Sequence, residues 1–213
     1  MEFRRIRTGK EQFFFLLQLA YILLALPLLL VFGTLMVLSM PPAEYRQDDG
    51  ALEGTIIIWL CVIVPVGIFF FRVVKKSRFL KRMVNSLRSP EYFSPESTHE
   101  MYHEGDCKYL GIDIKNGTIL YIHRVRKGQM DVIGMNLGDW TQRELEGNIL
   151  RLYTKFPELP RIEFSTPWAQ RWYDTLGAME YKRYEHSQRF SDYVNSRVEQ
   201  LERDTKVQIS KLA

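Results

Sequence analysis

Two histidines and a glutamate stand at a spacing that is used for zinc chemistry, in the segment His99-Glu100-Met101-Tyr102-His103. The segment matches H-E-x-x-H, in which a helix presents both imidazoles to one zinc ion and the glutamate acts as general base. A membrane-anchored zinc metalloprotease that uses His99, Glu100 and His103 is therefore one hypothesis for the chain.

The surroundings of this motif argue against a zinc site. Gly105 and the strand pattern that begins at Lys108 leave no room for a long helix around it. A catalytic zinc ion also needs a third protein ligand, and no helix with a suitable Glu or His follows soon after the motif. We therefore expect no metal site here, and the zinc metalloprotease is kept as the alternative.

The rest of the sequence holds no common catalytic or nucleotide-binding motif. It lacks G-x-x-x-x-G-K-[ST], G-x-G-x-x-G, G-x-S-x-G and C-x-x-C. Its 2 cysteines and 4 histidines are too few for a disulfide-dense scaffold or a multi-metal site. We expect a protein that is not an enzyme and needs no cofactor.

Two apolar runs dominate the N-terminal part of the chain. No Asp, Glu, Lys, Arg or His stands from Phe13 to Met40 or from Thr55 to Phe71. A helix needs roughly 20 apolar residues to cross the hydrocarbon core of a bilayer. The runs predict a transmembrane hairpin with spans at about 13–40 and 55–74. A cleaved signal peptide would have an apolar region of about 7–15 residues, which is shorter than the first run.

Basic residues flank the hairpin on the side of the chain termini. Arg4, Arg5, Arg7 and Lys10 precede the first span. A group that we name the basic cluster follows the second span with no acidic residue among its members: Arg72, Lys75, Lys76, Arg78, Lys81, Arg82 and Arg88. The loop between the spans carries one arginine and four acidic residues, so the positive-inside rule predicts a multi-pass protein with both termini in the cytoplasm.

The formal net charge of +4 and the pI of about 9.0 suggest a nucleic-acid binder. The excess basic residues, however, lie in the two membrane flanks, and residues 89–213 carry more acidic than basic side chains. A nucleic-acid site needs a basic face on a folded domain. We therefore expect no nucleic-acid partner and expect the basic cluster to bind the anionic surface of the lipid bilayer.

The remaining chain predicts a small β-rich cytoplasmic domain. Asn116-Gly117 predicts a hairpin turn, and Thr166-Pro167 predicts the start of a helix. That helix would bury an apolar stripe formed by Trp168, Trp172, Leu176 and Met179. Strands are predicted at 108–115, 118–125, 130–135, 149–154 and 162–164, with a short one after Trp140. Such strands, closed by a helix, resemble a pleckstrin-homology-like roll at the level of fold.

The sequence thus predicts an α+β membrane protein in three parts. They are a transmembrane hairpin with basic flanks (1–88), a β-rich domain closed by a helix (89–185) and an amphipathic C-terminal helix (186–213). The apolar stripe of the last part, which begins at Phe190, either packs on the domain or pairs with a second copy in a homo-oligomer.

Three stretches carry a family resemblance: MPPAEYR at 40–46, NGTILYIHRVRKGQMDVIG at 116–134 and EGNILRLYTKFPELPRIEF at 146–164. With this layout, the chain resembles the entry or surface exclusion proteins of I-complex conjugative plasmids. The resemblance implies an inner-membrane protein of a bacterial recipient cell. It implies a role in blocking redundant plasmid transfer through recognition of a membrane protein of the donor's transfer apparatus, and it supplies no catalytic residues.

Two surfaces are candidates for this recognition. Tyr45 and Arg46 lie in the outer loop, where a partner displayed by another cell would meet them, although so short a loop makes a small interface. The β-rich domain is the other candidate. A further alternative to exclusion is a lipid-binding membrane scaffold, in which this domain binds lipid headgroups beside the basic cluster.

Overall fold

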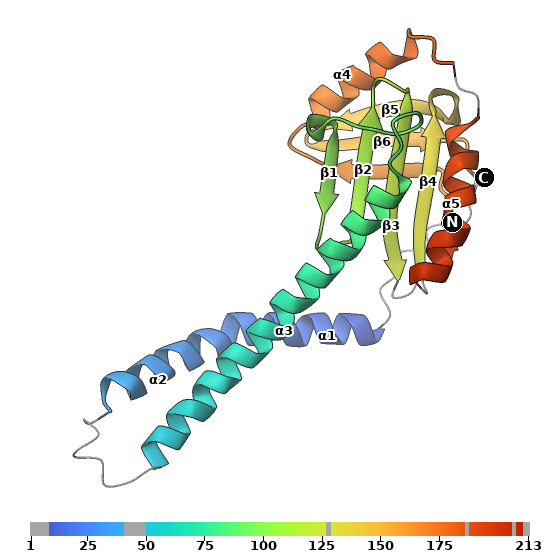
Figure 1. Ribbon diagram of the computed structural model, residues 1–213. Coiled ribbons are helices and arrows are strands. Elements are labelled where there is room, and N and C mark those ends of the chain that lie inside the picture. Colours follow the sequence, from blue (N-terminus) through green and yellow to red (C-terminus); the bar gives the residue numbers. More distant parts are fainter. Residues whose placement is uncertain (1–8, 41–49, 127–128, 186–187, 206–207, 211–213) are drawn as a thin grey trace. The chain divides into compact units, whose positions relative to one another are not determined.

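The computed structural model describes residues 9–40, 50–126, 129–185, 188–205 and 208–210 (Figure 1). The chain divides into two compact units, one that ends at Lys75 and one that begins at Lys76. This division falls inside a helix and precedes the boundary that the sequence predicted after Arg88.

The first unit consists of two long apolar helical segments. The first segment comprises α1 (Gly9–Ala20), a π-helical turn η2 (Tyr21–Ala25) and α2 (Leu26–Leu38). The second is the start of α3 (Gly50–Leu87). Both are long and apolar enough to cross a membrane, which confirms the two apolar helices predicted at 13–40 and 55–74.

A few specific contacts hold these two segments together. The π-helical turn ends two residues before Pro27, which has no N–H to donate and whose ring crowds the preceding turn. Its first residue, Tyr21, donates a hydrogen bond of 2.7 Å to the backbone oxygen of Cys61. Near the far end, Gly33 lies against Ile58 and Trp59, where an added Cβ would come within 3.2 to 3.5 Å of their side chains.

The C-terminal turns of α3 belong to the core of the second unit. Leu80, Met83, Val84 and Leu87 are each at most 1% exposed. Their spacing places them on one helix face, with the exposed Arg78 and Arg82 on the opposite face. The last turns of α3 therefore contribute these side chains directly to the core of the domain.

A five-stranded sheet forms the centre of the second unit, in the order β1-β2-β3-β4-β8. Its first four strands are antiparallel neighbours, and β8 pairs in parallel with β4. The strands are β1 (Glu100–His103), β2 (Lys108–Asp113), β3 (Thr118–Arg126), β4 (Gln129–Asn136) and β8 (Gln208–Ser210).

A second, three-stranded antiparallel sheet has the order β5-β6-β7, with β5 (Trp140–Glu146), β6 (Ile149–Thr154) and β7 (Arg161–Ser165). Two hydrophobic cores result. The end of α3 and helix α5 (Phe190–Thr205) pack on one face of the large sheet. The small sheet and α4 (Ala169–Glu180) share a core with the other face. This arrangement confirms the predicted α+β fold class.

The β2–β3 hairpin forms as predicted, but its turn is longer than Asn116-Gly117. Residues 114–117 connect the strands, because Asp113 pairs with Thr118. The carboxylate of Asp113 accepts hydrogen bonds from the backbone N–H groups of Lys115 and Asn116, at 2.9 and 3.1 Å. Gly117 alone among the described turn residues has a positive φ, at +65°.

The prediction that Trp168 belongs to the buried apolar stripe of α4 is wrong. Trp172, Leu176 and Met179 are buried, but Trp168 is 52% exposed. The helix begins at Ala169, and Trp168 caps it with φ −96° and ψ 13°, so its side chain lies off the helical stripe.

The segment predicted as a C-terminal helix, 186–213, contains both α5 and β8. The helix ends at Thr205, and the strand that follows joins the edge of the large sheet. Phe190, Val194 and Val198 are buried in the core that α5 shares with this sheet. Pairing of two copies through this helix stays a prediction.

Candidate functional site

The H-E-x-x-H segment lies on a strand and not on a helix. His99 ends a short 3₁₀ turn, η4 (Ser97–His99), and the four residues Glu100–His103 form β1. A strand advances about 3.3 Å per residue, so the two histidines are roughly 13 Å apart along the chain. The one-turn spacing that brings two imidazoles to a single zinc ion exists only in a helix.

The carboxylate of Glu100 accepts hydrogen bonds from neighbouring side chains. The Arg88 guanidinium and the Tyr109 hydroxyl both donate hydrogen bonds to its Oε2, the latter at 2.9 Å. Burial raises the pKa of Tyr109, and the charge of Glu100 raises it further. Glu100 therefore joins the end of α3 to the large sheet, because Arg88 follows directly after that helix.

The two histidines occupy separate surroundings. His99 is 4% exposed, and its Nδ1 lies 3.0 Å from the hydroxyl of Thr98. The ring of His103 packs against Phe164 with 4.4 Å between ring centroids. Burial lowers the pKa of His103, and the nearby positive charge of Lys108 lowers it further. Within the described part of the chain, no three His, Cys, Asp or Glu side chains are grouped so that they could hold a metal ion.

The basic cluster lies along α3 and just beyond it. Two of its members form ion pairs with the domain: Lys81 with Glu104 at 3.2 Å, and Arg88 with Glu100. The others lie exposed on the helix: Arg72, Lys75, Lys76, Arg78 and Arg82. Tyr45 and Arg46, the candidate recognition residues of the loop, lie outside the described residues.

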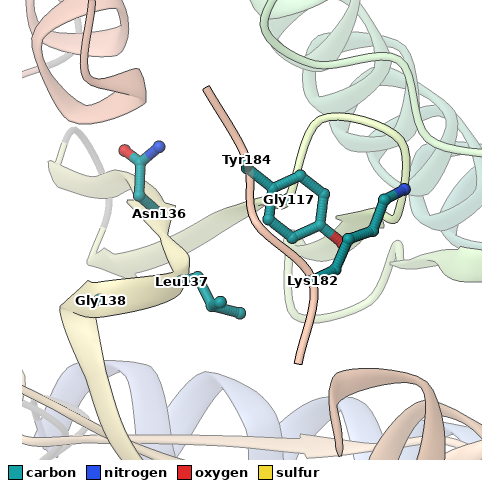
Figure 2. A pocket seen from close by; sticks show the side chains of 6 residues that line it. All are labelled: Gly117, Asn136, Leu137, Gly138, Lys182 and Tyr184. Carbon is teal, nitrogen blue, oxygen red and sulfur yellow. The ribbon is translucent and has the colours of Figure 1, made fainter. Parts of the chain in front are cut away.

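A small surface cavity of about 200 Å³ lies beside the β2–β3 turn (Figure 2). The ring of Tyr184 covers Gly117, and its hydroxyl donates a hydrogen bond of 3.0 Å to the backbone oxygen of Ile114. Lys182 supplies the charged side chain of the lining, and its Nζ lies 5.1 Å from the centroid of the Tyr184 ring. No sequence pattern indicates this cavity, because its walls come from segments that are distant along the chain.

The comparisons with known proteins identify a family. A model of the family described as "Exclusion-determining protein" matches residues 1–213. The chain belongs to this family. The match confirms the resemblance to exclusion proteins that the sequence suggested. No curated protein and no solved structure matches the chain.

Two aromatic side chains are exposed in the described part of the domain. Trp168 is 52% exposed and Tyr181 is 91% exposed, and they flank α4 at its two ends. Tryptophan and tyrosine are enriched among the residues that dominate protein–protein binding energy. The exposure of Trp168 was missed in the sequence because its spacing from Trp172 fits a helical stripe.

The outer face of the small sheet is charged. Arg151, at its centre, forms ion pairs with Glu144 at 3.6 Å, with Glu163 at 3.0 Å and with Glu146. Tyr153 donates a hydrogen bond of 2.8 Å to Glu144 on the same face. One arginine among three glutamates leaves this group of charges acidic on balance.

Proposed function

We propose that this protein acts in entry exclusion at the bacterial inner membrane, where it blocks redundant transfer of a conjugative plasmid into a cell that already carries one. The observation that carries the proposal is membership of the exclusion-determining family over the whole chain. Two helices that are long and apolar enough to cross a membrane are consistent with action at the cell envelope.

The proposed topology is a multi-pass protein with both termini in the cytoplasm. It is supported by the basic residues on the terminal flanks and the acidic balance of the loop between the spans. This topology presents the loop with Tyr45 and Arg46 outside the inner membrane and keeps the β-rich domain inside.

The proposed mechanism is contact with a membrane protein of the transfer apparatus, without covalent chemistry. The surroundings of the H-E-x-x-H segment support this, because Glu100 is bound to Arg88 and Tyr109 and the segment is a strand. A zinc protease would lose its activity on His103→Ala, whereas the contact mechanism predicts that exclusion survives a conservative His103→Gln change.

The test is a mating assay in which recipients express either this chain or an empty vector. We expect fewer transconjugants from donors of the related plasmid when the chain is present. An equal frequency in the two recipients would contradict the proposal.

The same assay locates the recognition surface. Tyr45→Ala and Arg46→Ala test the loop, and Trp168→Ala and Tyr181→Ala test the domain, with membrane abundance of each variant measured in parallel. Because a partner displayed by another cell meets the outer loop first, we expect the loop variants to lose exclusion. Loss that is confined to Trp168→Ala or Tyr181→Ala would assign recognition to the domain instead.

A further inference from the structure

A crevice of about 890 Å³ opens between the two segments of the hairpin, and Tyr21, which bonds to Cys61, is one of its lining residues. Its walls come from side chains between Phe14 and Leu26 on the first segment and between Pro65 and Arg72 on α3. These walls are apolar except at Gln18, Tyr21 and Arg72. The hydroxyl of Tyr21 is already used in its bond to Cys61.

The two remaining polar side chains of the crevice are suited to a ligand. Gln18 is exposed, and its amide has no hydrogen-bond partner within the described part of the chain. An amide without a partner is costly in an apolar surrounding. Arg72 is also exposed and can donate two parallel hydrogen bonds to a phosphate group.

The size of the crevice favours a single amphiphilic molecule over another protein helix. The α3 wall runs from Pro65 to Arg72, which is roughly 10 Å at 1.5 Å per residue. A transmembrane helix that docked along the hairpin would need a groove close to the 30 Å thickness of the hydrocarbon core. Clefts of about 300–1,000 Å³ are typical of sites for one small ligand.

The charge at one end of the crevice favours an anionic headgroup. Arg72 is its outermost residue on α3, and Lys75 follows within one helical turn. No acidic residue stands between Arg72 and Arg88. We propose that the crevice binds one anionic phospholipid, with the acyl chains against the apolar walls, the phosphate on Arg72 and a glycerol ester oxygen accepting from Gln18.

The test uses the full chain in a mild detergent and native mass spectrometry with added phosphatidylglycerol or phosphatidylcholine. We expect one tightly held phosphatidylglycerol in the wild type. Arg72→Gln should weaken this binding about fivefold, the factor that one basic residue contributes at an anionic surface. Arg78→Gln, which removes the same charge from α3 outside the crevice, is the matched control and should change it less than about twofold.

Gln18→Leu is a second variant that keeps the helix and the apolar wall, and it should weaken binding by about threefold, as the loss of one hydrogen bond in a membrane does. Equal effects of Arg72→Gln and Arg78→Gln would overturn the proposal, because they would indicate general attraction to the basic cluster. Binding of phosphatidylcholine that is as tight as the binding of phosphatidylglycerol would also overturn the proposal. A lipid-free dimer that Gln18→Leu dissociates would assign the crevice to a second copy of the chain.

Discussion

At the scale of single residues, the turn between β2 and β3 depends on a glycine. Gly117 has a φ of +65°, and a Cβ added there would lie 2.5 Å from Cγ of Tyr184. We expect Gly117→Ala to lower the free energy of unfolding of the domain by about 2 kcal/mol through backbone strain and overpacking. Chemical unfolding of the full chain in detergent measures this. Gly105→Ala is the control and should have little effect, because no atom lies within 4 Å of the added Cβ.

Protonation of His103 opposes folding. Burial against Phe164 and the charge of Lys108 lower its pKa, and these outweigh Asp106 and a backbone hydrogen bond to Ser165, which raise it. The unfolded chain therefore binds this proton more readily than the folded chain. The free energy of unfolding should be highest above the ordinary histidine range near pH 6.5 and should fall as the pH drops through that range.

Denaturant titrations of the full chain between pH 5 and pH 8 check this pH dependence, in buffers of equal ionic strength. His103→Gln should flatten the slope between those pH values in part, because burial also lowers the pKa of His99. A slope that is unchanged in the variant would show that His103 is not responsible.

The residue types of H-E-x-x-H were visible in the sequence, but their function depends on local structure. Gly105 and the strand pattern from Lys108 correctly indicated that no long helix surrounds the motif. The bond between Glu100 and Arg88 could not be predicted, because it requires the end of α3 to lie beside β1. The same holds for Tyr184 over Gly117, which no local pattern connects.

At the scale of elements, α3 begins as an apolar segment that is long enough to cross a membrane and ends in the core of the domain. We expect Leu80→Ala, at a side chain that is fully buried, to destabilise the domain by about 3 kcal/mol. Arg82→Ala changes an exposed neighbour on the same helix and should shift stability by less than about 0.5 kcal/mol. Equal unfolding midpoints for the two variants would contradict the packing of this helix end.

Elements with strong local signals were predicted well. β2, β3, β4 and β6 follow alternating patterns or turn residues, and the structure places them within two residues of the predicted bounds. The short strands β1 and β8 were missed, because three or four residues carry no periodicity and their pairing depends on distant partners. The apolar face of the last turns of α3 was missed because basic residues alternate with it.

At the scale of the whole molecule, the average composition does not show that the apolar segments with their basic flanks differ in charge from the β-rich domain. The positive charge that raises the pI lies at the flanks of the two apolar segments. The domain carries instead a surface of paired charges around Arg151 and two exposed aromatic side chains at the ends of α4. Local patterns were sufficient to predict the apolar helices and the β-rich domain. They were insufficient to identify the recognition surface, because a contact surface has no fixed residue spacing.

The most direct test of exclusion is the frequency of plasmid transfer into recipients that carry this chain. Donors of the related conjugative plasmid and donors of an unrelated plasmid are mated with recipients that express the full chain or a version with an early stop codon. Exclusion predicts that the chain lowers transfer of the related plasmid and leaves the unrelated plasmid unaffected. Equal transfer of the related plasmid into both recipients would contradict the account.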